Sequence, residues 1–245
     1  MKHVLMAAGG SIDTALLADF YVKNKSEIDC IVACDRGYEA LCAAGLRPDI
    51  VIGDMDSMSA EMRESLYIEE QGNIQDGSGE KGKNGNDGKN EKNGKNRETA
   101  VIRLNPVKDD TDTEAAIRVC TDRGAEKIYL FGATGNRLDH VLGNIELLAF
   151  AGSRGCELFI IDPHNRIRLC NNSISIKKSG QWGRFVSLIP YTPVVEKLTL
   201  RGFKYELTES DIKKGNTLGI SNEITADTAD ISFSKGSLIV IESLD

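Results

Sequence analysis

The chain lacks the features that mark several large classes of protein. It has no excess of basic residues: 37 acidic residues outnumber 30 lysines and arginines, and the net charge is −7. A nucleic-acid binder needs a basic face to meet phosphates, so this balance argues against that class. No apolar stretch has the length of a signal peptide or a membrane span. We therefore expect a cytoplasmic protein with neither a nucleic-acid partner nor a membrane partner.

The six cysteines lack a metal-binding pattern. They stand singly among apolar residues, with no CxxC pair and no histidine at ligand spacing. A structural zinc site is therefore not expected. In a reducing compartment these side chains are best interpreted as small buried hydrophobes.

Strand-like and helix-like stretches alternate over the first two thirds of the chain. Such alternation predicts an α/β fold with a Rossmann-like, mostly parallel sheet and helices on both faces. The strands are expected at residues 3–7, 30–34, 50–53, 100–104, 127–131 and 156–161. The helices are expected at residues 12–23, 38–44, 60–67, 113–123 and 138–150.

Two other regions have different patterns. Residues 70–98 consist mainly of Gly, Asn, Lys and acidic residues, so they predict a flexible surface insertion; an interaction tail is the alternative. After residue 162 helical patterning ends, and six short β-like runs separated by turn signals follow. They predict an all-β, sandwich-like second domain. We therefore divide the chain into an α/β domain at 1–162 and a β domain at 163–245.

Acidic residues follow several of the predicted parallel strands. In a parallel sheet the carboxyl ends of the strands share one edge, where ligands of open α/β sheets bind. That much like charge at one edge is unfavourable unless a cation or a cationic ligand neutralises it. The pattern predicts an oxygen cage for a hard cation such as Mg²⁺. The acids concerned are Asp35, Asp54, Asp56, Asp109, Asp110, Asp112 and Asp139.

Several of these sites have a structural explanation when taken alone, although a helix cap does not explain Asp109, Asp110 and Asp112. Asp56 or Ser57 can cap a helix that begins near residue 58, and Thr111 with Glu114 fits a capping box. Ser11 is the expected cap of the first helix. Only the recurrence of acids at successive strand ends favours the functional interpretation.

A glycine-rich turn after the fifth strand carries a second set of candidates. The run Gly135-Asn136-Arg137-Leu138-Asp139-His140 offers a planar guanidinium for phosphate oxygens and two polar side chains in the first turn of a helix. The structural alternatives are a solvated arginine, an acid that favours a helix N-terminus, and a partly buried histidine.

Taken together, these motifs resemble those of the thiamine pyrophosphokinase family, over nearly the whole chain except residues 70–98. The β-rich part adds two stretches that resemble the family's thiamine-side motifs. The six matching stretches, in chain order, are 35–37, 53–57, 110–112, 135–140, 202–207 and 219–223.

The resemblance implies Mg²⁺-dependent transfer of the diphosphate group of ATP to the hydroxyl of thiamine. It further implies a homodimer in which the two subunits share each site. Tyr205 would stack on thiamine, and Ser221 and Asn222 would hydrogen-bond its pyrimidine. The metal ligands would be Asp54, Asp56, Asp110 and Asp112; the catalytic residues Asp54, Asp56, Asp112 and Arg137; the residues that bind the co-substrates Asp35, Gly37, Asp110, Arg137, Asp139 and His140.

Two other functions stay open on the sequence. The first is a Mg²⁺-dependent phosphohydrolase, or a diphosphotransferase that uses another small alcohol. The second is a non-catalytic nucleotide or thiamine sensor, with the β-rich domain as its reporting module.

Overall fold

The computed structural model describes residues 1–54, 99–104 and 110–245. Asp56, Asp109, the expected helix at 60–67 and the expected insertion at 70–98 therefore lie outside the described residues. Among the described residues, no helix combines the length and the hydropathy needed to cross a membrane.

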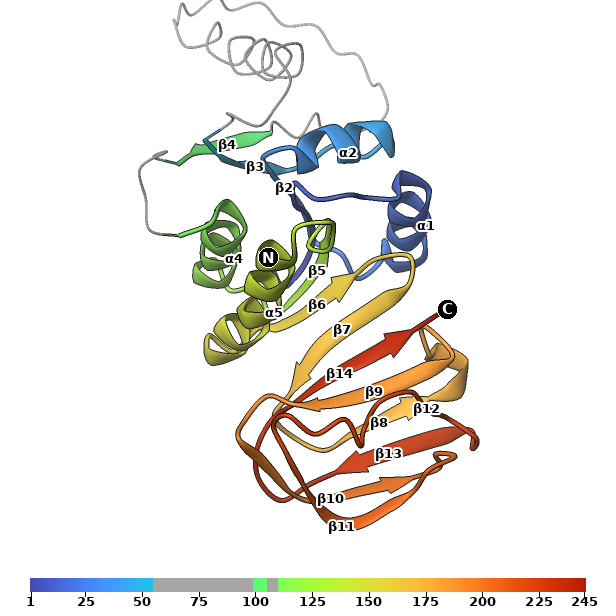
Figure 1. Cartoon of the computed structure of the whole chain (residues 1–245). Helices are drawn as coiled ribbons and strands as arrows, with labels where there is room; N and C mark the ends of the chain where they lie inside the picture. Colours follow the sequence, from blue (N-terminus) through green and yellow to red (C-terminus); the bar gives the residue numbers. More distant parts are fainter. Residues whose placement is uncertain (55–98, 105–109) are drawn as a thin grey trace, which may run out of the picture.

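The α/β part is built on six parallel strands in the order β4-β3-β2-β1-β5-β6 (Figure 1). Each strand is a short apolar run, and all five residues of β2 are buried, as a strand covered on both faces requires. The strands are β1 His3–Ala7, β2 Cys30–Cys34, β3 Ile50–Gly53, β4 Ala100–Arg103, β5 Lys127–Phe131 and β6 Glu157–Ile161.

Helices cover both faces of this sheet, as predicted. Alternate residues of β1 point to opposite faces: Leu5 packs in the core that includes α1 and α2, and Met6 in the core that includes α4 and α5. The helices are α1 Thr14–Asn24, α2 Gly37–Ala43, α4 Asp112–Asp122 and α5 Leu138–Ser153.

Two helix caps can be compared with their predictions. The Thr111 hydroxyl accepts a hydrogen bond from the Glu114 N–H at 3.2 Å, so the predicted cap of α4 is confirmed. The prediction for α1 is wrong, because its cap is Asp13 and not Ser11. The Asp13 carboxylate accepts from the N–H groups of Ala15 and Leu16, each at 3.0 Å. A carboxylate satisfies two otherwise unpaired donors there.

The sheet does not stop at β6. Strand β7 pairs with β6 in the antiparallel sense, and β14, β9 and β12 follow, so that ten strands form one sheet. A second sheet of four strands, in the order β11-β10-β13-β8, packs on this antiparallel half around a core that includes Leu188 and Ile231. The result is the sandwich-like β part expected after residue 162.

The strands of the β part are short and joined by turns (Figure 1). They are β7 Asn165–Cys170, β8 Ile174–Lys177, β9 Phe185–Pro190, β10 Val194–Arg201, β11 Leu207–Lys213, β12 Asn222–Glu223, β13 Thr228–Ser232 and β14 Leu238–Ser243.

A buried ion pair lies where the β part meets the α/β part. Glu242 on β14 is 0% exposed, and its carboxylate accepts hydrogen bonds from Arg166 Nε at 3.0 Å and Arg166 Nη2 at 2.7 Å. The backbone N–H of Trp182 donates to the same carboxylate at 2.9 Å. The Trp182 ring meets Phe20 of α1 edge-on, with ring centroids 6.3 Å apart. This carboxylate therefore organises the contact between the two parts.

Five of the six cysteines are buried, as predicted, and Cys42 is the exposed exception. Burial raises the pKa of Cys120 to about 12 and the pKa values of Cys156 and Cys170 to about 11 each. These thiols stay protonated at neutral pH and serve as apolar packing groups.

Candidate active site

The candidate site lies at the carboxyl edge of the parallel strands. The strand order changes direction between β1 and β5, because β2 follows β1 on one side while β5 lies on the other. The exits of these two strands touch: the Ala8 N–H donates to the Phe131 carbonyl at 2.8 Å and the Gly10 N–H to the Gly132 carbonyl at 3.0 Å. This edge has the geometry at which open α/β sheets bind ligands.

Three carboxylates gather at this edge. Asp35 follows β2, Asp54 follows β3 and Asp112 is the first residue of α4. One oxygen from each lies within 4.8 Å of an oxygen of the other two. Asp35 is buried and the other two are half-buried. Three separate segments thus deliver like charges to one small volume, which is an arrangement suited to a hard cation.

The backbone around Asp35 explains how a buried carboxylate is held there. Asp35 has a φ of +46°, and its N–H donates to the Ile52 carbonyl at 3.1 Å, which joins the ends of β2 and β3. A Cβ on Gly53 would lie 1.8 Å from Asp35 Oδ1, so only glycine admits this carboxylate. A Cβ on Gly37 would lie 1.9 Å from the Ala7 carbonyl oxygen. Gly37, a predicted co-substrate residue, therefore also allows α2 to begin against the end of β1.

Asp110, a predicted metal ligand, has a different neighbour. Its Oδ2 lies 2.6 Å from Nη1 of Arg118 on α4, and this hydrogen bond is the main cause of the raised pKa of Arg118. Glu114 binds the same guanidinium at 2.9 Å. The structure therefore places Asp110 in an ion-pair network with α4, while Asp112, two residues later, belongs to the carboxylate group.

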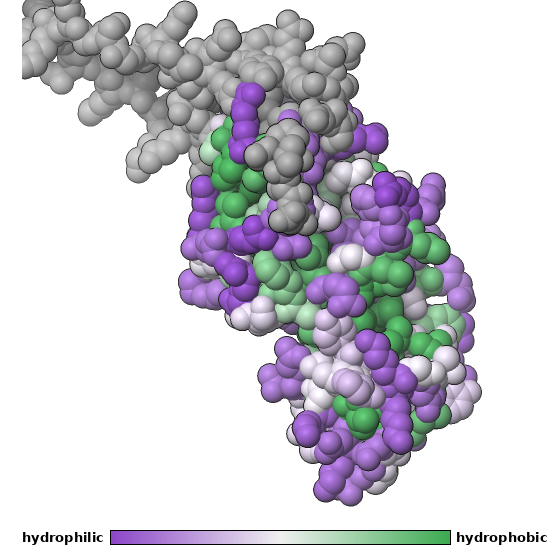
Figure 2. Space-filling view, turned by 60° about the vertical axis from the view of Figure 1, so that its left-hand side comes forward, coloured by the Kyte–Doolittle hydropathy of each residue, from purple (hydrophilic) through white to green (hydrophobic). Residues whose placement is uncertain are grey.

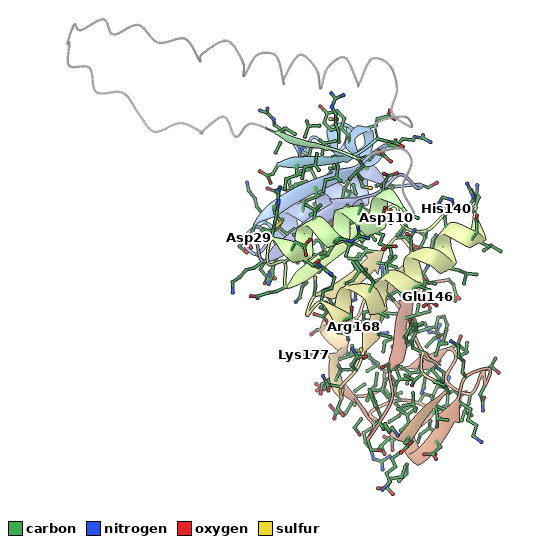
Figure 3. The ribbon with its side chains drawn as sticks, turned by 90° about the vertical axis from the view of Figure 1, so that its left-hand side faces the viewer. Asp29, Asp110, His140, Glu146, Arg168 and Lys177 are labelled. Carbon is green, nitrogen blue, oxygen red and sulfur yellow. The ribbon has the colours of Figure 1, made fainter. Side chains whose placement is uncertain are left out.

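Arg137 and Asp139 form an exposed pair at the start of α5. Arg137 Nη2 lies 2.6 Å from Asp139 Oδ2, and Nε lies 3.2 Å from Oδ1, which is a bidentate arrangement. The hydrogen bond from Arg137 lowers the pKa of Asp139 to about 2. His140 follows on the exposed first turn of α5. Figure 3 shows Asp110 and His140 on the same side of the α/β part, opposite Asp29 near the strand amino ends.

The predicted thiamine-side residues lie far from the carboxylates of the same chain. Tyr205 is 63% exposed, Ser221 is exposed and Asn222 is buried. Asn222 belongs to β12, which is the first strand in the ten-strand order, whereas β3 is the ninth. Eight strand spacings of about 4.8 Å amount to roughly 38 Å along the sheet. One chain therefore does not bring the two predicted sets of residues together.

Comparison with known families decides the ancestry of the chain. Residues 21–160 match the family model described as thiamin pyrophosphokinase, catalytic domain. Residues 171–238 match the model described as thiamin pyrophosphokinase, vitamin B1 binding domain. The chain belongs to the thiamine pyrophosphokinase family. The resemblance seen in the sequence motifs is thereby confirmed.

Relatives within the thiamine pyrophosphokinase family match the whole chain. The thiamine pyrophosphokinase of Bacillus subtilis is 30% identical over 245 residues, all of this chain and all of that protein. A crystal structure of the Bacillus subtilis enzyme superposes with a TM-score of 0.77 over 100% of both chains. The Geobacillus thermodenitrificans structure has a TM-score of 0.75 and 32% identity, covering 99% of this chain and 98% of that chain.

Sequence reasoning counted Asp35 among the acids of the sheet edge but not among the four predicted metal ligands. We predicted it as a co-substrate residue, although it stands at the end of a strand that neighbours β3. Strand adjacency was the signal that could have found it, because β2 and β3 are consecutive and parallel. The pairing of Asp110 had a weaker signal, which was an arginine six residues after Asp112 on the predicted helix.

Proposed function

We propose that this chain is a thiamine diphosphokinase, which transfers the diphosphate group of ATP to thiamine and releases AMP. The observation that carries the proposal is the convergence of three carboxylates at the edge where the strand order reverses, in a chain matched by both family models. In the reaction, the thiamine hydroxyl oxygen bonds to the β-phosphorus of ATP. The bond between the β-phosphorus and the oxygen that bridges it to the α-phosphate breaks, and the hydroxyl proton passes to a base.

Magnesium fits the three carboxylates. Asp35, Asp54 and Asp112 each offer a carboxylate oxygen within 4.8 Å of the others, and Mg²⁺ prefers oxygen ligands with room for waters and phosphates. A bound Mg²⁺ would neutralise charge on the phosphate oxygens. We retain Asp56 as a candidate ligand, and Asp56 or Asp112 as the base. Asp110 would act indirectly, through its ion pair with Arg118.

Arg137 is proposed to bind the polyphosphate. Its side chain is 70% exposed, and it stands between the end of β5 and the start of α5. The pair with Asp139 holds the guanidinium in a fixed plane, which is suited to phosphate oxygens. His140, on the same turn, is retained as a residue that binds the co-substrate.

Thiamine is proposed to bind the β part, with the ring of Tyr205 stacked on its pyrimidine and Ser221 beside it. The match of residues 171–238 to the vitamin B1 binding model supports this division, as does the match of 21–160 to the catalytic model. We therefore keep the predicted domains at 1–162 and 163–245.

We propose a homodimer, and the distance between the two sets of residues supports it. Roughly 38 Å along the sheet separates the predicted thiamine-side residues from the carboxylates of one chain. In the proposed dimer, a second copy of the chain supplies the thiamine side. Large apolar side chains are exposed on both regions: Leu138 and Leu142 on α5, and Leu218 and Ile220 before β12. Figure 2 also shows apolar residues gathered on the middle of the molecule. Such exposed patches are typical of interfaces.

We propose the cytoplasm as the location.

The test is to incubate the protein with ATP, Mg²⁺ and thiamine and to quantify AMP and thiamine diphosphate. Equal amounts of both products, absent without thiamine or without metal, are expected. Phosphate release without thiamine would instead identify a phosphohydrolase. Binding of nucleotide and thiamine with no product would identify a sensor.

A further inference from the structure

Two segments of the β part lie side by side around Tyr205. Phe203 pairs with Ile224 across an antiparallel bridge, and the Lys204 N–H donates to the Glu223 carbonyl at 2.8 Å. The Lys204 ammonium also lies 2.9 Å from Glu223 Oε1, and 5.6 Å from the centre of the Tyr205 ring. The chain thus presents Tyr205 at the end of a short ladder.

The side chain of Asn222 closes this ladder. Its Oδ1 accepts hydrogen bonds from the Tyr205 N–H at 3.0 Å and the Glu223 N–H at 2.9 Å. Its Nδ2 donates to the Tyr205 carbonyl at 2.7 Å. The amide therefore binds both backbone polar groups of Tyr205, as a paired strand residue would. Two N–H donors on one side and a carbonyl on the other also fix which way the amide points.

Asn222 and Tyr205 differ in their burial. Asn222 is 6% exposed, whereas Tyr205 is 63% exposed. The segment before Asn222 is anchored as well, because the Ser221 N–H donates to the hydroxyl of buried Ser187 at 3.0 Å. Within the described residues, a buried amide thus fixes the backbone from which an exposed aromatic ring projects.

From this geometry we infer that Asn222 is a positioning residue, which holds the Tyr205 ring in place for stacking on the pyrimidine of thiamine. This inference rests on the proposed function and revises the role implied by resemblance, a direct hydrogen bond from Asn222 to the pyrimidine. The three hydrogen bonds use both lone pairs of Oδ1 and one of the two Nδ2 hydrogens. Most of the hydrogen-bonding capacity of the amide is thereby used within the chain itself.

A double-mutant cycle on Asn222 and Tyr205 tests the inference. Asn222→Ala is expected to raise the KM for thiamine about tenfold, because an unheld backbone loosens the ring, while the KM for ATP changes less than about twofold. In a Tyr205→Ala background the same substitution is expected to change the thiamine KM less than about twofold. Asn222→Asp, which keeps the acceptor atoms, is expected to lie between wild type and Asn222→Ala.

Two readouts separate this inference from the proposed function. Calorimetry of thiamine binding reports affinity whether or not turnover occurs. Hydrogen exchange at the Tyr205 amide reports only how firmly Asn222 holds this backbone group. Faster exchange in Asn222→Ala is expected. An equal loss of thiamine affinity in both backgrounds would indicate direct contact and overturn the inference, as would unchanged exchange. A wild-type protein that neither binds thiamine nor forms AMP would overturn the proposed function, while the exchange measurement would still decide whether Asn222 holds Tyr205.

Discussion

Two carboxylate centres in this protein differ in how their negative charge is balanced. Glu242 is 0% exposed and is matched by the bidentate guanidinium of Arg166 and by the Trp182 N–H. At the edge of the parallel strands, three carboxylates instead lie within 4.8 Å of one another. In the first arrangement a buried charge is matched by its partners, whereas the second gathers like charge. Like charge brought together by three separate segments is a feature expected of a functional site, at some expense of stability.

The largest difference between the two centres should appear in turnover. Asn in place of Asp54 removes a charge from the proposed metal site, so we expect Asp54→Asn to lower kcat by at least about 100-fold. The thermal midpoint should stay the same or rise, because repulsion among the acids falls. AMP formation at saturating substrates and a thermal melt measure both quantities. Retention of turnover within about threefold would remove Asp54 from the site.

Glu242 should respond in the opposite way. Glu242→Gln leaves the Arg166 guanidinium without its charge partner, so we expect a loss of about 3 kcal/mol in the free energy of unfolding. The folded variant should keep a kcat close to that of wild type. Denaturant unfolding measures the loss. The matched control is Glu126→Gln, which breaks an exposed pair with Lys2 at 2.8 Å and should lower the free energy of unfolding far less, because solvent screens that pair. Equal losses of unfolding free energy in the two variants would contradict the expected difference between the buried and the exposed ion pair.

Metal should stabilise one centre and leave the other unaffected. At ten times its dissociation constant, Mg²⁺ with a nucleotide should add about 1.4 kcal/mol to stability and raise the thermal midpoint by roughly 3–6 °C. The rise should persist in Glu242→Gln and disappear in Asp35→Asn, because asparagine keeps the left-handed backbone at φ +46° but not the charge. Differential scanning fluorimetry with and without a chelator measures this shift. A rise in all three proteins would place the metal elsewhere.

The exposed Arg137–Asp139 pair should make a small, pH-dependent contribution to stability. The pKa of Asp139 is lowered to about 2 by the hydrogen bond from Arg137. The pair therefore stabilises the folded state above the ordinary aspartate pKa of about 4, and this contribution is lost as pH falls toward 2. Carboxyl NMR titration should give a midpoint near 2 in wild type and near 4 in Arg137→Gln. A midpoint near 4 in both proteins would refute the pairing in solution.

The parallel strands were predictable because each is an apolar run that ends in turn residues or acids. The order of the strands was harder, since nothing local indicates that β5 lies beside β1, or that β7 extends the sheet past β6. Those contacts form between residues that are distant in sequence. The cap of α1 illustrates a local error, because Ser11 and Asp13 both suit the position and only the backbone path selects Asp13.

The site was predictable as a set of acids and not as a geometry. The sequence pattern indicated an acidic edge, but membership of the group depends on strand adjacency and on side-chain partners. Asp35 belongs to the carboxylate group because β2 lies next to β3. Asp110 instead pairs with Arg118 on α4. The separation of Asn222 from the acids also required the strand order, which spans ten strands.

The most direct test of the account compares Asp112→Asn with Asp110→Asn. These acids stand two residues apart, but only Asp112 belongs to the carboxylate group, while Asp110 pairs with Arg118. The measurement is the Mg²⁺ dependence of AMP formation in wild type and both variants. We expect Asp112→Asn to lose turnover at every Mg²⁺ concentration, and Asp110→Asn to keep it within about tenfold. Equal losses in both variants, or full activity in Asp112→Asn, would contradict the proposed metal centre.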